Sequence, residues 1–349
     1  MTKTQLRRVL LSTAAAFLVC AIAMPAYATD PTLKWCEGVN IAAFAGGFSG
    51  GDWFAKAFVS GFHQAEIDLG PSVYVYYSQW NPKAMLAQLG EAIDNKVDGV
   101  AFMGMPGDAA SDDLIDKAFA QGTVVTTLNV ALPDAEKKHS SQGMGYVGPS
   151  NYASGTALAS EAVKRASLKA GDSVFVWGSK DAAGDAAQRT IGLIDAFEKA
   201  GAKVIYRDVA KLLVPDKDAV NPKVGGGFSA TPTFVDVMGA NPGVKVVAFA
   251  IHPDAGFSVD ALARAASLKP GQVFFAGYDM SHDALRAMKS GYLNLVLDDQ
   301  PYLQGYLPIV NICLTKKFGF SGLDVNTGGA FIDSSNVEAI APLVEDSIR

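Results

Sequence analysis

The sequence predicts an α/β fold with two doubly wound, mostly parallel β-sheets, and three observations support this prediction. Short, continuously hydrophobic runs recur along the chain, as expected of strands that are covered on both faces of a parallel sheet. The segments between these runs carry apolar residues at helical spacing. This alternation of strand and helix occurs twice, over roughly residues 36–148 and again from about Asn151, which predicts two domains.

The predicted strands are runs rich in apolar, β-branched and aromatic residues. They cover residues 39–45, 73–77, 99–104, 123–129, 173–178, 203–209, 244–251, 273–279 and 292–298. Helical stripes lie between them, such as Phe54, Phe58 and Phe62 after the first strand. Residues 211–232 show neither pattern and are predicted to form a long loop. Its glycines at 225–227 are interpreted as flexible filler rather than as a ligand contact.

The first 28 residues are predicted to be a cleaved secretory signal. Arg7 and Arg8 give a basic start, an apolar run covers residues 9–24, and the small side chains within residues 26–28 suit a signal peptidase. Removing residues 1–28 removes three basic residues and no acidic one, so the net charge changes from −6 to −9. We therefore expect an exported, soluble protein, cleaved after about Ala28, that has no membrane anchor and binds no nucleic acid.

Two cysteines, Cys36 and Cys313, follow the predicted signal. In an oxidising compartment such a pair can form a disulfide. The alternative is two free cysteines that are buried as small hydrophobic residues. The residues alone leave both interpretations open.

The motifs of catalysis, nucleotide binding and metal binding are all incomplete. The glycines within residues 46–51 do not match G-x-G-x-x-G, and Asp52 stands where a P-loop has its phosphate-binding lysine. Residues 281–283 (Ser-His-Asp) are adjacent, so they cannot form a catalytic relay. The four histidines are scattered, and the acidic pair Asp298 and Asp299 lacks calcium-loop spacing. We expect no enzymatic activity, no cofactor and no metal.

Polar and aromatic residues follow the carboxyl ends of several predicted strands, which is where open α/β sheets bind ligands. These residues are Asp52, Trp53, Phe54, Asn129, His252, Asp279 and Gln300. Flat rings together with carboxylate, amide and guanidinium groups suit a sugar, whose C–H faces stack and whose hydroxyls need donors and acceptors. Four of them have a specific alternative role: core packing for Trp53 and Phe54, a structural role for His252, and a helix cap for Asp279.

Taken together, the sequence resembles the periplasmic sugar-binding proteins of the ribose-binding type, the type I substrate receptors of ABC importers. The most specific part is AGYDMSHDALRAMKSGYLNLVLDDQPYLQGY (276–306), and VDGVAFMGMPGDAA (97–110) and VGPSNYASGTALA (147–159) fit other landmarks. The resemblance implies two Rossmann-like lobes joined by a three-crossover hinge. The first lobe would hold residues 36–149 and 301–327, and the second residues 150–300 and 328–349.

The resemblance also implies which residues contact the sugar. They are Asp52, Trp53, Phe54, Asn129, Arg189, His252, Asp279 and Gln300. Val130 stands where the family commonly has an arginine, and Met105 stands near a usual asparagine. Losing a bidentate donor and an amide favours a less hydroxylated or differently shaped ligand than ribose.

The function implied by the resemblance is a receptor that closes on a pentose or hexose and delivers it to an ABC-type permease. The alternative is a polyol or a furanose-like signalling molecule, with a chemoreceptor as a further partner. A monomer is implied, and a Cys36–Cys313 disulfide within one lobe is feasible. Asp298 and Asp299 are expected to stay solvated at the third crossover, and Tyr302 and Tyr306 to share one helical face.

Overall fold

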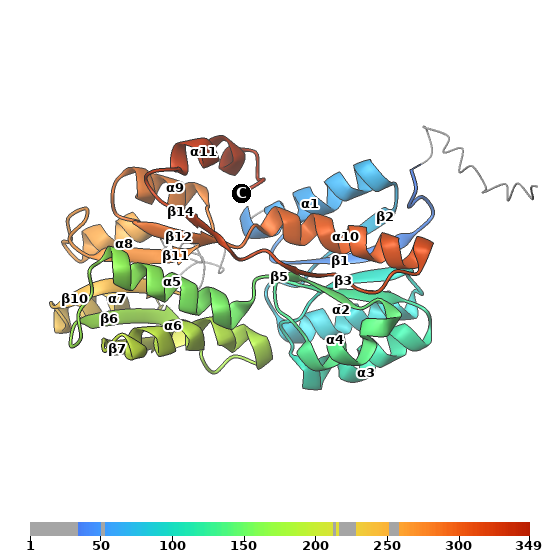
Figure 1. Ribbon diagram of the computed structural model, residues 1–349, viewed down its shortest axis with the longest axis horizontal. Coiled ribbons are helices and arrows are strands. Elements are labelled where there is room, and N and C mark those ends of the chain that lie inside the picture. Colours follow the sequence, from blue (N-terminus) through green and yellow to red (C-terminus); the bar gives the residue numbers. More distant parts are fainter. Residues whose placement is uncertain (1–33, 50–52, 212–213, 216–227, 251–257) are drawn as a thin grey trace, which may run out of the picture. The chain divides into compact units, whose positions relative to one another are not determined.

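The computed structural model describes residues 34–349 apart from 50–52, 212–213, 216–227 and 251–257. The described part contains two six-stranded sheets and one small two-stranded sheet (Figure 1). The predicted α/β class with two mostly parallel sheets is therefore confirmed. Within these described ranges, no helix is both long and apolar enough to cross a bilayer.

The first sheet has the strand order β13-β5-β4-β3-β1-β2, and all its neighbouring strands are parallel. Its strands are β1 (Asn40–Gly46), β2 (Ser72–Tyr77), β3 (Gly99–Met103), β4 (Val124–Leu128), β5 (Gly145–Gly148) and β13 (Asp324–Asn326). The inner strands β3 and β4 are buried at every residue, because helices cover both faces of the sheet.

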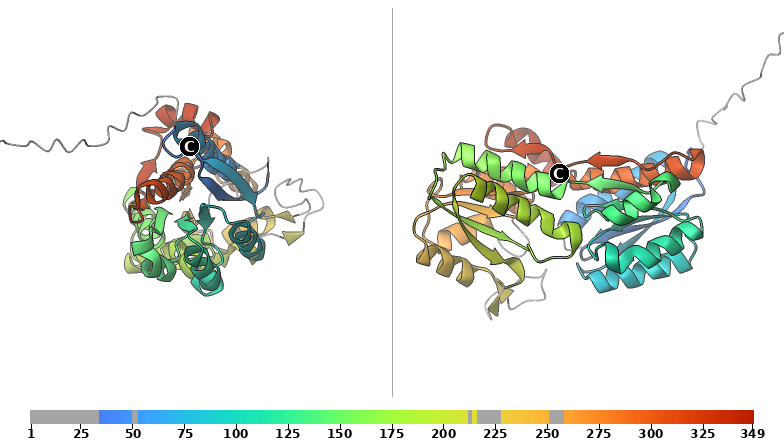
Figure 2. Two further views of the ribbon diagram at one scale, coloured as in Figure 1. Left: turned by 90° about the vertical axis from the view of Figure 1, so that its right-hand side faces the viewer. Right: turned by 60° about the horizontal axis from the view of Figure 1, so that its bottom comes forward.

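The helices of the first sheet lie in two layers. They are α1 (Trp53–Leu69), α2 (Pro82–Asp94), α3 (Asp108–Ala120), α4 (Pro133–His139) and α10 (Pro301–Phe318). In Figure 1, α1 and α10 lie on one side of the strands and α2, α3 and α4 on the other. The right-hand view of Figure 2 shows the same two layers, with α10 in orange-red above the strands and the cyan and teal helices below.

The second sheet has the order β14-β12-β11-β10-β6-β7, and only β14 is antiparallel to its neighbour. Its strands are β6 (Ser173–Gly178), β7 (Lys203–Asp208), β10 (Val244–Phe249), β11 (Phe274–Tyr278), β12 (Leu295–Asp298) and β14 (Ala330–Ile332). Its helices are α5 (Asn151–Arg165), α6 (Gln188–Lys199), α7 (Thr231–Ala240), α8 (Val259–Ala265), α9 (His282–Lys289) and α11 (Val337–Glu345). Two hydrophobic clusters, one with α5 and α6 and one with α7, α8 and α9, cover its faces.

The sequence patterns missed the shortest strands. β5, β13 and β14 have three or four residues each, which is too few for a hydrophobic run to stand out. The predicted loop 211–232 also contains two-residue strands, β8 (Val214–Pro215) and β9 (Phe228–Ser229), and the start of α7. The glycines at 225–227 lie outside the described residues.

In the part of the chain that the structure describes, the backbone passes between the two sheets three times. It does so between β5 and β6, between β12 and β13, and between β13 and β14. This is the three-crossover connection that the family resemblance implied. We propose that these passages bound two lobes, with residues 36–149 and 301–327 in the first and residues 150–300 and 328–349 in the second.

Helix α10 returns to the first sheet and is fastened there by several contacts. A disulfide joins Cys313 on this helix to Cys36, just before β1, and both residues are fully buried. The rings of Tyr302 and Tyr306 stack with their centroids 6.4 Å apart, and the Tyr306 hydroxyl donates to Asp68 Oδ2 at 3.1 Å. Asp68 lies on α1, so the two tyrosines share the face of α10 that borders this helix.

Candidate ligand-binding site

Left-handed backbone conformations mark the carboxyl ends of the strands. Five non-glycine residues with positive φ lie there: Gln79 and Trp80 after β2, Asn129 after β4, Asp279 after β11, and Gln300 after β12. The other such residues in the described ranges follow the ends of helices. A bulky residue in such a conformation costs roughly 1–3 kcal/mol, and residues strained in this way occur mainly at active sites and ligand-binding sites. The strained residues therefore point to the carboxyl ends of the strands as the functional edge.

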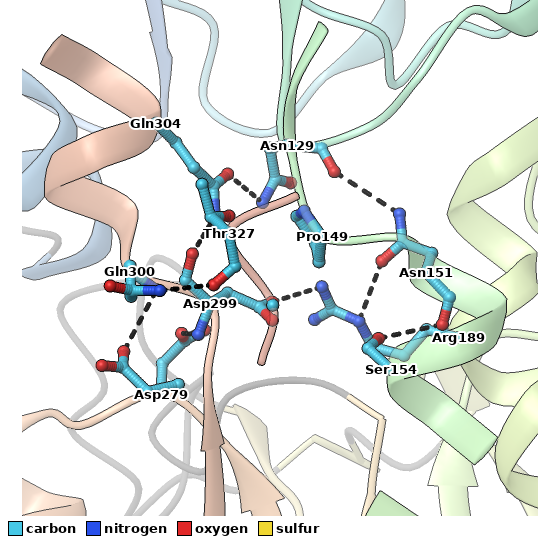
Figure 3. Close-up of polar contacts among 12 residues, drawn as sticks. Asn129, Pro149, Asn151, Ser154, Arg189, Asp279, Asp299, Gln300, Gln304 and Thr327 are labelled. Carbon is cyan, nitrogen blue, oxygen red and sulfur yellow. Dashed lines mark hydrogen bonds and ion pairs between the residues drawn. The ribbon is translucent and has the colours of Figure 1, made fainter. Parts of the chain in front are cut away.

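A chain of polar contacts runs across this edge from Asp279 to Asn151 (Figure 3). Asp279 Oδ1 accepts a hydrogen bond of 2.8 Å from the backbone N–H of Asp299. The carboxylate of Asp299 in turn pairs with Nη2 of Arg189, and Arg189 Nε donates to Asn151 Oδ1 at 3.1 Å. The guanidinium also lies 4.1 Å from the ring centroid of Tyr278. These contacts hold Arg189 in one orientation by charge, hydrogen bond and ring stacking.

The two adjacent aspartates, Asp298 and Asp299, are both fully buried. The expectation that their charges stay solvated is therefore wrong. Asp298 pairs with Nη1 of Arg349 at 2.6 Å, and Asp299 pairs with Arg189. Burial of such charges is tolerated because each has a cationic partner. These partners are 51 and 110 residues away along the chain, so no local pattern could have indicated them.

Asp279 is also buried, with 1% of its surface exposed. This burial raises the pKa of Asp279 well above its usual value, and the charges of Asp299 and Asp298 raise it further, whereas Arg189 opposes the shift. A carboxyl group that keeps its proton can both donate and accept hydrogen bonds. Asp279 can therefore serve a hydroxyl group in either role.

Amide side chains connect the end of β4 to the start of α10. Asn129 Nδ2 donates to Gln304 Oε1 at 3.1 Å, and Gln304 Nε2 donates to the carbonyl of Asp299 at 2.6 Å. Gln300 donates its side-chain N–H to the carbonyl of Thr327 at 2.6 Å. Thus it is the carboxylate of Asp299, rather than the amide of Gln300, that lies with Arg189 in this structure.

A second set of contacts ties the end of β4 to the 3₁₀ turn η2 (Gly184–Ala187). Asp185 Oδ2 accepts from the backbone N–H of Ala131 at 3.2 Å and from Asn151 Nδ2 at 2.6 Å. Asn151 Nδ2 also lies 3.4 Å from the carbonyl of Asn129. Asn151 therefore connects the Arg189 contacts to the strand end that carries Asn129.

Residues 42–313 match the family model described as a periplasmic binding protein domain. This chain belongs to the periplasmic binding protein family. A relative, the xylose/arabinose-binding protein XylF of Sulfolobus acidocaldarius, is 25% identical over 264 residues. The match covers 73% of this chain and 61% of XylF, so the chain spans less than two thirds of that relative's length.

Solved structures share the fold of this periplasmic binding protein. An ABC transporter solute-binding protein from Burkholderia graminis, in complex with D-arabinose, superposes with a TM-score of 0.69 at 18% identity, covering 87% of this chain and 98% of its own. A carbohydrate transporter protein from Acidothermus cellulolyticus, in complex with myo-inositol, has a TM-score of 0.69 at 21% identity, covering 89% and 99%. At these identities the likeness establishes the fold alone.

A small group of aromatic side chains packs together around the start of α1. Phe54 is only 5% exposed and packs edge-on against Phe58, with the ring centroids 4.9 Å apart. This burial fits the alternative role of Phe54 in the core. Trp53 is half-buried and packs against Phe54 at 5.5 Å, so part of its indole stays accessible. The ring centroid of Trp80, which the sequence analysis did not single out, lies 6.0 Å from that of Phe54.

The structure brings together some of the predicted site residues, whereas others have different partners or lie outside the described residues. Asn129, Arg189 and Asp279 belong to one network, whereas the side chain of Gln300 is bonded to Thr327. Asp52 and His252 lie outside the described residues. The sequence analysis missed Asn151, Asp299, Gln304 and Trp80. A polar residue one position beyond a strand, as in Asp299 after β12, was the available signal for one of them.

Proposed function

We propose that this protein is a periplasmic receptor that binds a neutral monosaccharide, a pentose or a hexose, between its two lobes. The observation that carries the proposal is the polar network of Asn129, Arg189, Asp279 and Asp299 at the carboxyl ends of strands from both sheets, in which the two carboxyl groups are buried and the amide and guanidinium groups are partly accessible. Donors and acceptors held in this way match the hydroxyls of a sugar. Because Asp299 balances the charge of Arg189, the network favours a neutral ligand over an anionic one.

The names of related proteins support the same class of ligand. XylF is named for binding xylose and arabinose, and the two solved structures hold D-arabinose and myo-inositol. The second candidate ligand is a polyol or a furanose-like signalling molecule. Val130 and Met105 support it, because both stand where the family commonly has polar residues that contact the sugar. Val130 is 7% exposed, and Met105 packs against the hydrophobic core of the first sheet.

In the proposed mechanism the ligand shifts the balance between two forms of the receptor. A sugar that contacts residues of both lobes in only one form stabilises that form, so binding closes the hinge. An ABC-type permease would recognise the closed receptor, and a chemoreceptor is the alternative partner. The protein would act as a monomer and by binding alone, without catalysis. The basic and apolar start of the sequence supports export to the periplasm with removal of residues 1–28.

A thermal-shift panel tests the proposed function. The probes are D-xylose, L-arabinose, D-arabinose, D-allose, myo-inositol and xylitol, with an amino-acid set and a nucleoside set for comparison. We expect at least one carbohydrate to raise Tm, since saturation at about 100 times Kd adds about 2.7 kcal/mol to the free energy of unfolding. A rise with an amino acid or a nucleoside, and with no carbohydrate, would contradict the proposal.

A pair of matched variants connects this shift to the network. Arg189→Lys keeps a positive charge beside Asp299 but loses the planar fork that also reaches Asn151, so the ligand-induced rise in Tm should shrink. Arg165→Lys alters an arginine that pairs with Glu161 and Asp333 on the surface of the second lobe, and it should leave the rise unchanged. An equal ligand-induced rise in Tm in the two variants would show that Arg189 does not contribute to ligand binding.

A further inference from the structure

Trp80 lies over the carboxyl end of β1. A Cβ atom added to Gly46, the last residue of that strand, would be only 2.6 Å from Cζ3 of the indole, so the ring rests on the space that a side chain would occupy. The same added atom would be 3.0 Å from Sδ of Met103 at the end of β3. The centroid of the Trp80 ring is also 6.0 Å from that of Phe54. The indole is thus placed at the edge where a parallel sheet receives its ligand.

The backbone that carries this ring is strained. Gln79 and Trp80 are consecutive left-handed residues, with φ of 53° and 56°, a conformation that bulky side chains rarely adopt. Two hydrogen bonds hold them there, from Trp80 N–H to the Gly46 carbonyl at 2.9 Å and from Gln79 N–H to the Gly47 carbonyl at 3.1 Å. Asn81 then caps α2 through hydrogen bonds to the N–H groups of Lys83 and Ala84.

Glycine or asparagine would adopt this left-handed conformation with less strain than tryptophan. The local backbone therefore does not account for tryptophan at position 80. Core packing accounts for only part of it, because the indole is half-buried rather than enclosed. Strain retained at a ligand-facing edge is typical of residues that contact a ligand.

We infer that Trp80 forms a wall of the ligand site and stacks on a ring-shaped ligand. This inference rests on the proposed function and deepens it, since an indole face attracts the C–H face of a rigid ring. A pyranose or a cyclitol presents such a face, whereas an open-chain polyol of the same size must first lose conformational freedom to do so. Trp80 thus selects cyclic ligands over acyclic ones.

Calorimetric titration of four proteins tests this inference with probes on which the ligand classes differ. The proteins are the wild type, Trp80→Asn, Trp80→Phe and Trp35→Phe, and the probes are D-allose, D-arabinose and myo-inositol against xylitol and sorbitol. Asparagine suits the left-handed backbone but removes the ring, and phenylalanine keeps a smaller ring. Trp35 precedes β1 at the opposite end of that strand and is 37% exposed, which makes it the matched control.

We expect Trp80→Asn to weaken binding of a cyclic probe by about tenfold, which is the upper range of a ring contact, and to weaken acyclic probes less. Trp80→Phe should fall between it and the wild type, and Trp35→Phe should match the wild type within about twofold. If Trp80→Asn binds the cyclic probe as tightly as Trp35→Phe does, the inference is wrong while the proposed function stands. If the wild type binds none of these probes and no carbohydrate of the thermal-shift panel, the proposed function fails and this inference fails with it.

A fluorescence measurement covers the case in which Trp80→Asn does not fold. In the Trp35→Phe protein, a bound cyclic probe should protect tryptophan emission from acrylamide, because it covers the exposed part of Trp80. The protection should decrease when Trp80→Phe is added to this protein. Protection of equal size in the two proteins would contradict the inference.

Discussion

At the scale of single residues, the pKa of an acidic side chain depends on whether it is buried or hydrogen-bonded at the surface. Asp279 is buried beside two further aspartates, and its pKa is raised chiefly by that burial. Asp333 is the opposite case, since hydrogen bonds from Ser335 and then from Arg165 lower its pKa to about 2. The two carboxyl groups should therefore make stability depend on pH with opposite signs.

We expect Asp279→Asn to stabilise the ligand-free protein relative to the wild type by an amount that grows with pH. Above about pH 4 the unfolded chain releases the Asp279 proton while the folded protein still holds it, so the wild type loses stability as pH rises toward the raised pKa of the folded state. Asparagine does not titrate and still accepts the Asp299 N–H. Urea unfolding from pH 2 to pH 8 measures this difference.

The matched control for this measurement is Asp333→Asn. Its wild-type carboxylate stabilises the fold above the unfolded pKa of about 4, and this stabilisation disappears as pH falls through about 2. The variant should therefore be less stable than the wild type at pH 7 and similar to it near pH 2. A difference for Asp279→Asn that does not vary with pH would contradict the raised pKa of Asp279.

Single residues also differ in how far the sequence could predict them. Asn129 and Asp279 were found because each directly follows a hydrophobic strand, and strand direction places both at the binding edge. Asp299 was assigned to solvent, although it is buried against Arg189. The sequence contains both residues, but it does not indicate that they meet, because 110 residues separate them.

At the scale of elements, glycines allow pairs of helices to approach closely. On α1 a Cβ added to Gly61 would be 2.2 Å from the carbonyl oxygen of Tyr302, and on α10 a Cβ added to Gly305 would be 2.2 Å from that of Phe58. Helices α5 and α6 meet in the same way, since a Cβ on Gly155 would be 2.2 Å from the carbonyl oxygen of Arg189. This second contact sets the position of the helix that carries the Arg189 side chain.

We expect Gly305→Ala to destabilise the protein by about 1–3 kcal/mol or more, because the added methyl meets backbone that cannot move away alone. Gly90→Ala is the matched control on α2, where the nearest atom to an added Cβ is a Leu114 methyl at 3.8 Å. That substitution should stabilise the protein by up to about 1 kcal/mol. Urea denaturation compares the two, and similar effects would contradict the close approach of α1 and α10.

The helical pattern alone did not distinguish these glycines. In a sequence a glycine within a helix indicates only a lower helix propensity, and Gly90 and Gly305 look alike in that respect. Their roles differ because an added Cβ at Gly90 would meet a Leu114 methyl at ordinary contact distance, whereas one at Gly305 would meet the backbone of a second helix. Contacts of this kind exist only once both helices are packed.

At the scale of the whole molecule, the disulfide closes most of the chain into one loop. Cys36 and Cys313 are 277 residues apart, and both lie with the first sheet, one before β1 and one on α10. The second sheet is built entirely from chain within and after this loop. The link therefore fastens the returning helix to the first lobe and leaves the passages between the sheets unrestrained.

We expect the double variant Cys36→Ser with Cys313→Ser to lose about 2–4 kcal/mol of stability, because the unfolded chain regains the freedom that the cross-link removes. Its affinity for a carbohydrate probe should match that of the wild type, since the bond lies within one lobe. Thermal unfolding and calorimetry measure the two quantities. Two free thiols in unreduced, denatured protein that starts at residue 29 would show that the bond does not form.

The architecture of this protein follows from its sequence to a large extent, and its binding chemistry follows to a smaller one. Hydrophobic runs and helical stripes depend on residues that are close along the chain, so they revealed the parallel strands, their direction and hence the edge that binds ligands. The pairing of Asp299 with Arg189 and of Asp298 with Arg349 depends on residues that only the packed fold brings together. The position of the Trp80 ring over Gly46 likewise depends on packing between residues that are distant along the chain. Burial and charge pairing are properties of such distant neighbours, which is why the tertiary structure was needed to assign them.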